Sequence, residues 1–125
     1  MKIFTKEEQK ARKFIRATMK QLKVKMGLWQ WTINIEYLSM IDNELPNCAT
    51  VAQCTPIWQY LTATIEINMK EFCLLTEGEQ ERILIHELCH ILVAEMREED
   101  QDRKHEERVV TTLTDAFIWM RNSRA

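Results

Sequence analysis

Residues 86–90 carry the pattern in this chain with the most chemical content, His86-Glu87-Leu88-Cys89-His90. Two residues four apart on a helix lie on one face, so both imidazoles can reach a single ion. Neutral imidazole is a good zinc ligand, with nitrogen–metal distances near 2.0–2.1 Å. Glu87 lies to the side of that face, where its carboxylate can take a proton from a water molecule that the ion activates. The spacing therefore predicts metal-assisted hydrolysis.

The pattern is specific for a chain of this composition. With 3 histidines in 125 residues, chance produces on the order of 0.01 matches in the whole chain. The alternative is a structural pair of histidines with a surface glutamate beside them. Two imidazoles and a carboxylate on a buried helix are costly without a partner, so we prefer the metal-binding interpretation. Cys89, three residues after His86, is expected to point toward the sheet and not to bind the metal.

A catalytic zinc site needs a third protein ligand and keeps its fourth position for water. The candidates are His105, Glu106 and Glu107, at the start of the last expected helix. Helical phase places Glu106 in the apolar stripe of that helix, and Glu107 beside it on a polar stripe with Thr111 and Asp115. We favour Glu107 over Glu106, with His105 as a third option. Thr111 or Asp115 would then orient a ligand by hydrogen bonding.

The elements that must position these residues form an α+β chain, expected to be a single domain over residues 1–125. Thr5 can cap the first helix and Gly27 can end it, and Thr76 with Glu79 has the spacing of a capping box. Pro56 places the second strand at a turn or an edge. We expect helices over about 5–26, 79–96 and 105–122, strands over about 31–37, 49–55 and 62–67 in a mixed or antiparallel sheet, and loops over 42–47 and 97–104.

The motif, followed by Glu107 on a later helix, resembles the gluzincin branch of the zincin metallopeptidases. The order of helix, small three-stranded sheet, motif helix and glutamate helix resembles the catalytic half of zincins, and the short length is similar to minimal phage- or bacteria-encoded gluzincin-like proteins. The resemblance implies zinc (Zn2+), a peptide or protein substrate, the ligands His86, His90 and Glu107, and Glu87 as base. It also implies a peptide lying along an edge strand, matched here by Thr62–Ile67.

Larger gluzincins add a second domain with a histidine or tyrosine that stabilises the oxyanion. In this chain Tyr60, Tyr37 or His105 would have to substitute, and the sequence selects none of them. The leading hypothesis is a zinc-dependent peptidase. One alternative is a zinc-containing, non-catalytic module that binds a protein partner. Another is a phage-type regulator that cleaves one narrow protein target, such as a repressor.

Composition excludes several other classes. The 17 basic and 19 acidic side chains give a net charge of −2, which argues against nucleic acid or a membrane surface as a partner. Only two glycines occur, too few for a P-loop or a dinucleotide fingerprint. No apolar run approaches the roughly 18 residues that span a bilayer, and the polar start does not predict a secretory signal. We therefore expect a cytoplasmic protein, in the host cell if phage-encoded, with reduced cysteines; the pattern leaves the oligomeric state open.

Overall fold

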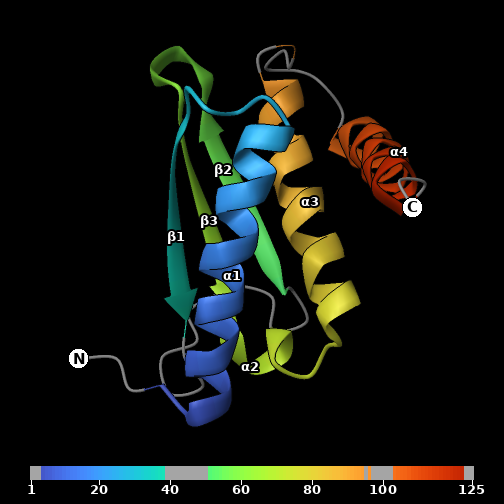
Figure 1. Cartoon of the computed structure of the whole chain (residues 1–125). Helices are drawn as coiled ribbons and strands as arrows, with labels where there is room; N and C mark the ends of the chain where they lie inside the picture. Colours follow the sequence, from blue (N-terminus) through green and yellow to red (C-terminus); the bar gives the residue numbers. More distant parts are fainter. Residues whose placement is uncertain (1–3, 39–50, 95, 97–102, 123–125) are drawn as a thin grey trace.

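The computed structural model describes residues 4–38, 51–94, 96 and 103–122, without the side chains of 103–105. The described part is α+β, as expected, with its long helices on one side of a three-stranded sheet (Figure 1). Its elements are α1 (Lys6–Lys25), β1 (Thr32–Leu38), β2 (Ala52–Ile57), the 3₁₀ turn η1 (Trp58–Tyr60), β3 (Thr62–Asn68), α2 (Met69–Phe72), α3 (Glu77–Ala94) and α4 (Arg103–Asn122). The expected loop over 42–47, and most of that over 97–104, lie outside the described residues.

Local signals position α1 as the sequence predicts. The Thr5 hydroxyl accepts a hydrogen bond from the Glu8 amide at 3.1 Å, and the Glu8 carboxylate accepts one from the Thr5 amide at 3.1 Å. This capping box satisfies two amides that the first turn leaves without partners. Gly27 ends the helix with a φ of +74°, a conformation that favours glycine. Between these ends, one apolar stripe is buried: Ala11, Ile15, Met19 and Leu22.

The sheet is mixed, and its strand order is β1-β3-β2. β1 runs parallel to β3 with Thr32 opposite Thr62, whereas β2 runs antiparallel to it with Ala52 opposite Ile67. β3 is therefore the central strand, and the expectation that Thr62–Ile67 forms the edge is wrong. The edge beside the motif helix is β2, because α3 packs against that strand. Pro56 lies within β2, consistent with the rule that proline in a sheet is tolerated at an edge.

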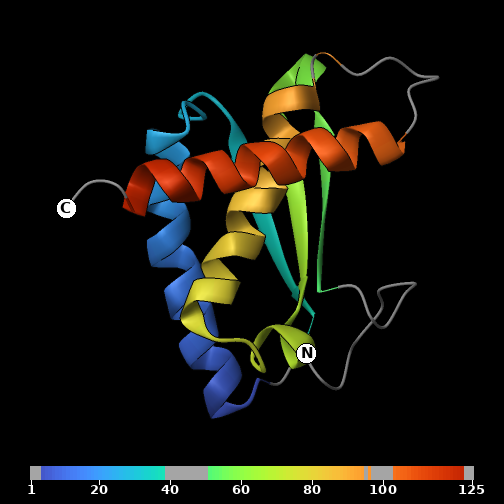
Figure 2. The ribbon, with the colours of Figure 1, turned by 90° about the vertical axis from the view of Figure 1, so that its right-hand side faces the viewer.

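One face of the sheet is covered by α1 and α3, and α4 lies across α3 on the side away from the sheet (Figure 2). Alternation along β3 buries Ala63, Ile65 and Ile67 under these helices. α3 is apolar around most of its circumference because it packs against β2, α1 and α4. The buried core joins residues of α1, β3, α2, α3 and α4 in a single cluster.

The start of α3 is anchored by two sets of side-chain contacts. Thr76 and Glu79 form the expected capping box, with hydrogen bonds of 2.9 and 3.2 Å. The buried Gln80 amide donates to the carbonyl oxygens of Phe72 and Leu75 at 3.0 and 3.2 Å. These contacts join α3 to the short helix α2, which the sequence did not predict. The contacts of Thr76, Glu79 and Gln80 fix the start of α3. They thereby help to set where the motif, two to four turns further along the helix, lies over the sheet. None of the described helices is long and apolar enough to cross a membrane.

Candidate metal centre

α3 carries His86 and His90 one helical turn apart on the same side. Their rings meet edge to face, with centroids 5.1 Å apart. His86 is partly accessible, with 27% of its side chain exposed, and His90 is more enclosed at 10%. Burial and the nearby His90 lower the pKa of His86, while Glu107 opposes that shift. The neutral imidazole, which is the form that binds metals, is therefore favoured at His86.

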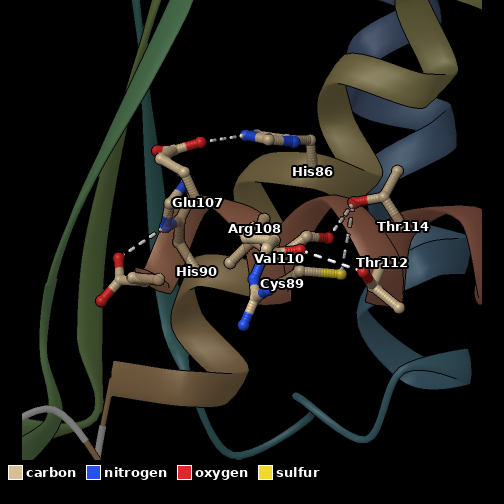
Figure 3. A network of polar contacts seen from close by, with 9 residues as sticks. His86, Cys89, His90, Glu107, Arg108, Val110, Thr112 and Thr114 are labelled. Atoms are coloured by element: carbon tan, nitrogen blue, oxygen red, sulfur yellow. Dashed lines mark hydrogen bonds and ion pairs between the residues drawn. The ribbon is translucent and has the colours of Figure 1, made fainter. Parts of the chain in front are cut away.

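α4 brings the Glu107 carboxylate to both rings (Figure 3). One carboxylate oxygen lies 3.2 Å from Nε2 of His86, and the other lies 3.0 Å from Nε2 of His90. The ligand atoms of these three residues all lie within 4.8 Å of one another. Ligand atoms around a tetrahedral zinc with bonds of 2.0–2.1 Å lie about 3.3 Å apart. The two nitrogen–oxygen distances are close to that spacing, so this set of two nitrogens and a carboxylate could hold a divalent cation.

Glu106 approaches His90 from the other edge of the ring. Its carboxylate lies 2.7 Å from Nδ1 of His90, and its side chain is only 5% exposed. Glu107, in contrast, is 56% exposed. Glu107, the favoured candidate, joins the cluster, whereas Glu106 contacts the nitrogen of His90 that lies outside it. The side chain of His105, the third option, lies outside the described residues.

The Glu87 carboxyl is buried beside this cluster, at 6% exposure. Burial, and secondarily the charge of Glu107, raises its pKa to about 8. Both causes oppose ionisation, the first by removing water and the second by like-charge repulsion. A cation held by the neighbouring residues would favour the ionised form. Glu87, the base that the sequence predicts, therefore has a pKa well above that of an ordinary glutamate.

Cys89 lies inside the motif but contacts α4. The Thr114 hydroxyl lies 3.7 Å from its sulfur and donates a 2.8 Å hydrogen bond to the Val110 carbonyl oxygen (Figure 3). The expectation that Cys89 points to the sheet is wrong, because α4 covers that side of α3. Burial raises the pKa of the thiol, which favours its protonated form. Cys89 is not among the residues that converge on the cluster.

Two ion pairs also connect α4 to α3, on the N-terminal side of the motif along α3. Arg82 binds Asp115 at 2.6 Å, and Arg121 binds Glu81. Asp115 therefore contacts Arg82, and the expectation that it orients a metal ligand is wrong. Thr111, the other candidate for that role, is exposed. Arg82 lies one turn before His86 on α3, so the sequence spacing already places both residues on the helix face that meets α4.

Two of the three candidate oxyanion donors, Tyr37 and Tyr60, lie in the described part of the chain. The Tyr37 ring contacts Phe4 edge to face, at 6.5 Å between centroids, and the Arg12 guanidinium lies 4.8 Å from it. Phe4 precedes α1 and Arg12 lies in its second turn. Tyr60 projects from η1 with 78% of its surface exposed. The side chain of His105, the third candidate, lies outside the described residues.

The fold and the cluster define an α+β chain with a histidine–histidine–glutamate centre between two helices. Comparison with protein-family profiles, with curated proteins and with solved structures finds no match to this chain.

Proposed function

We propose that the chain is a metal-dependent peptidase in which His86, His90 and Glu107 hold the ion and Glu87 is the general base. The single observation that carries the proposal is the approach of one Glu107 carboxylate to both imidazoles, at 3.2 and 3.0 Å, beside the buried Glu87. The arrangement brings two imidazole nitrogens and a carboxylate from two helices close enough to hold one ion. The likeness of the motif and element order to gluzincins supports the same interpretation.

The donor set favours zinc among the common divalent ions. Two imidazoles and one carboxylate are a ligand set found in catalytic zinc sites. When bound, the ion supplies Lewis acidity, which lowers the pKa of water and polarises a carbonyl group. The half-exposed Glu107 and the partly exposed His86 leave one side of the cluster open to solvent, which a substrate would need.

Glu87 performs the proton transfers in this proposal. Its carboxylate accepts a proton from the attacking water and then donates that proton to the nitrogen of the departing amine. Burial raises its pKa to about 8 in the absence of an ion, and a bound cation would lower that pKa toward the ionised form that accepts the first proton. The substrate peptide would lie along β2, the strand that packs beside α3, by backbone pairing of the kind that extends a sheet.

Metal analysis and an activity assay test the proposal together. The purified chain is expected to contain about one zinc per molecule and to cleave a denatured protein or a peptide library. Glu87→Gln is expected to keep its metal and to lose most of the cleavage. Glu77→Gln makes the same chemical change on the exposed first turn of α3 and is expected to leave cleavage unchanged. Equal cleavage by the parent and Glu87→Gln, after contaminating proteases are excluded, would overturn the mechanism.

A second candidate function is recognition of a protein partner without cleavage. It is favoured by one observation: Tyr37, one of the candidate oxyanion donors, is engaged with Phe4 and Arg12. The same three ligands would then join α3 to α4 structurally. Stability that depends on zinc, without cleavage of any member of a peptide library, would favour this function. A regulator with one narrow target would also cleave no member of that library. Cleavage of its own protein partner distinguishes it from a module that only binds.

A further inference from the structure

We propose that Glu106 is the positioning residue of this centre: it fixes the ring of His90 so that Nε2 is the nitrogen presented to the metal. The inference rests on the metal-binding part of the proposed function and does not require that the chain cleaves peptides. It assigns separate tasks to two adjacent glutamates, since Glu107 supplies a ligand and Glu106 holds another ligand in place.

The geometry places one carboxylate at each ring nitrogen of His90. Glu106 lies 2.7 Å from Nδ1, and Glu107 lies 3.0 Å from Nε2. The two nitrogens point out of opposite edges of an imidazole ring, so a carboxylate oxygen at Nδ1 is directed away from a cation at Nε2. Glu106 therefore does not coordinate the same ion in this arrangement.

Burial gives the Glu106 contact its strength. The Glu106 side chain is 5% exposed and that of His90 is 10% exposed. A carboxylate taken out of water is costly unless hydrogen-bond donors replace its solvation. The Nδ1–H of His90 supplies such a donor, at a distance typical of a charge-assisted hydrogen bond. The rotation of the ring is then restrained by a contact that water cannot readily replace.

The backbone of α4 holds Glu106 in that position. Val110, one turn after Glu106, is fully buried. Thr114, one further turn along, is also buried and contacts Cys89 on α3. This row of buried residues places the carboxylate of Glu106 against α3, while Glu107, rotated by about 100° on the helix, reaches the open side of the cluster.

The chemical consequence concerns the tautomer of His90. When Nδ1 carries the proton that Glu106 accepts, the lone pair of Nε2 is available to a cation. A carboxylate at the outer nitrogen also makes the imidazole a more basic ligand. Loss of such an outer partner typically weakens metal binding about 10- to 100-fold.

Zinc affinity and the state of the His90 ring test this role. We expect Glu106→Ala to weaken zinc binding about 10- to 100-fold, measured by competition with a fluorescent chelator. We expect Glu106→Asp to show a similar loss, because it keeps the charge but withdraws the carboxylate by one methylene. Glu106→Gln keeps an acceptor oxygen at full length and is expected to retain more affinity than either variant. Correlation spectra of the 15N-labelled, zinc-loaded parent should show a proton on Nδ1 of His90, and Glu106→Gln should retain it.

Asp115→Asn is the matched control. It removes an ion pair between α3 and α4 without touching His90, and we expect it to keep the parental zinc affinity. An equal loss of affinity in Asp115→Asn would overturn the inference, because Glu106 would then act only by docking α4. Parental affinity in Glu106→Ala, or in Glu106→Asp if the alanine variant does not fold, would also overturn it. So would a zinc-loaded parent with no proton on Nδ1 of His90. A protein that binds zinc as described but cleaves nothing would overturn the proposed peptidase alone.

Discussion

Three glutamates lie around two histidines, and their surroundings divide the chemistry among them. Glu87 is buried, and burial and the charge of Glu107 raise its pKa to about 8, a shift that a bound cation would oppose. Glu107 is half exposed and contacts both imidazoles, which suits a ligand. Glu106 is buried against the outer nitrogen of His90. Residue type alone does not separate these tasks, whereas exposure and contact geometry do.

The tasks of Glu106 and Glu107 predict different losses of zinc affinity. Glu107→Gln replaces a charged ligand by a neutral amide, so we expect its dissociation constant to rise by more than the roughly 100-fold upper value for an outer partner. Competition with a fluorescent chelator measures the constants of both variants under the same conditions. An affinity for Glu107→Gln equal to that of the parent would show that this carboxylate is not a ligand.

The three motif residues of the site could be predicted from the sequence because they are local. His86, Glu87 and His90 share one helix, and a spacing of four fixes their common face whatever surrounds them. The third ligand depends on how α4 crosses α3, which helical phase alone left open between Glu106 and Glu107. Glu106 did carry a signal, since a carboxylate in an apolar stripe requires a buried partner. That partner, Nδ1 of His90, belongs to another helix, so only the tertiary structure identifies it.

At the scale of elements, the helix starts were predicted and the sheet order was not. Capping boxes at Thr5 and Thr76 involve residues three apart in sequence, so their signal is complete within one turn. The position of a strand in a sheet depends on partners far along the chain. The alternation in Thr62–Ile67 reports that one face is buried, and it is the same for a central strand and an edge. Proline at position 56 was the available indication that the second strand lies at an edge.

The capping box of α3 predicts an acid-sensitive contribution to stability. The hydrogen bond from the Thr76 amide, followed by the contact with the Thr76 side chain, lowers the pKa of Glu79 below its ordinary value. The unfolded chain therefore binds the Glu79 proton more tightly than the folded chain does. Stability from this group is present above the ordinary carboxyl pKa and is lost as the pH falls through the lowered folded-state pKa.

Glu79→Gln is expected to remove that part of the acid dependence. Urea unfolding of the parent and of the variant, repeated at several pH values in the presence of a chelator, measures the difference. The two unfolding free energies should converge toward acid pH and diverge toward neutral pH. Glu77→Gln changes an exposed glutamate in the same turn and should follow the parent more closely. A difference between parent and Glu79→Gln that does not vary with pH would contradict this assignment.

At the scale of the whole molecule, the candidate centre joins α4 to α3, the helix that lies between α4 and the sheet. α1 and α3 form a layer on the sheet, and α4 lies across α3 on the outer side of that layer (Figure 2). Its contacts with α3 include the buried Val110 and Thr114 and the ion pairs of Arg82 and Arg121. Exposed ion pairs contribute little to stability. A cation bound between Glu107 and the two histidines would therefore be a substantial part of what docks the first turns of α4.

We consequently expect zinc to stabilise the whole chain and the start of α4 in particular. A ligand that binds only the folded state at 100 times its dissociation constant adds about 2.7 kcal/mol, or roughly 10 °C in melting temperature for a chain of this size. Thermal unfolding with zinc and with a chelator measures the total effect. Hydrogen exchange should slow most in the first two turns of α4 and around His86 and His90. Glu107→Gln should lose most of both responses, whereas Asp115→Asn should keep them. Equal melting temperatures for the parent with zinc and with chelator would show that no cation joins these helices.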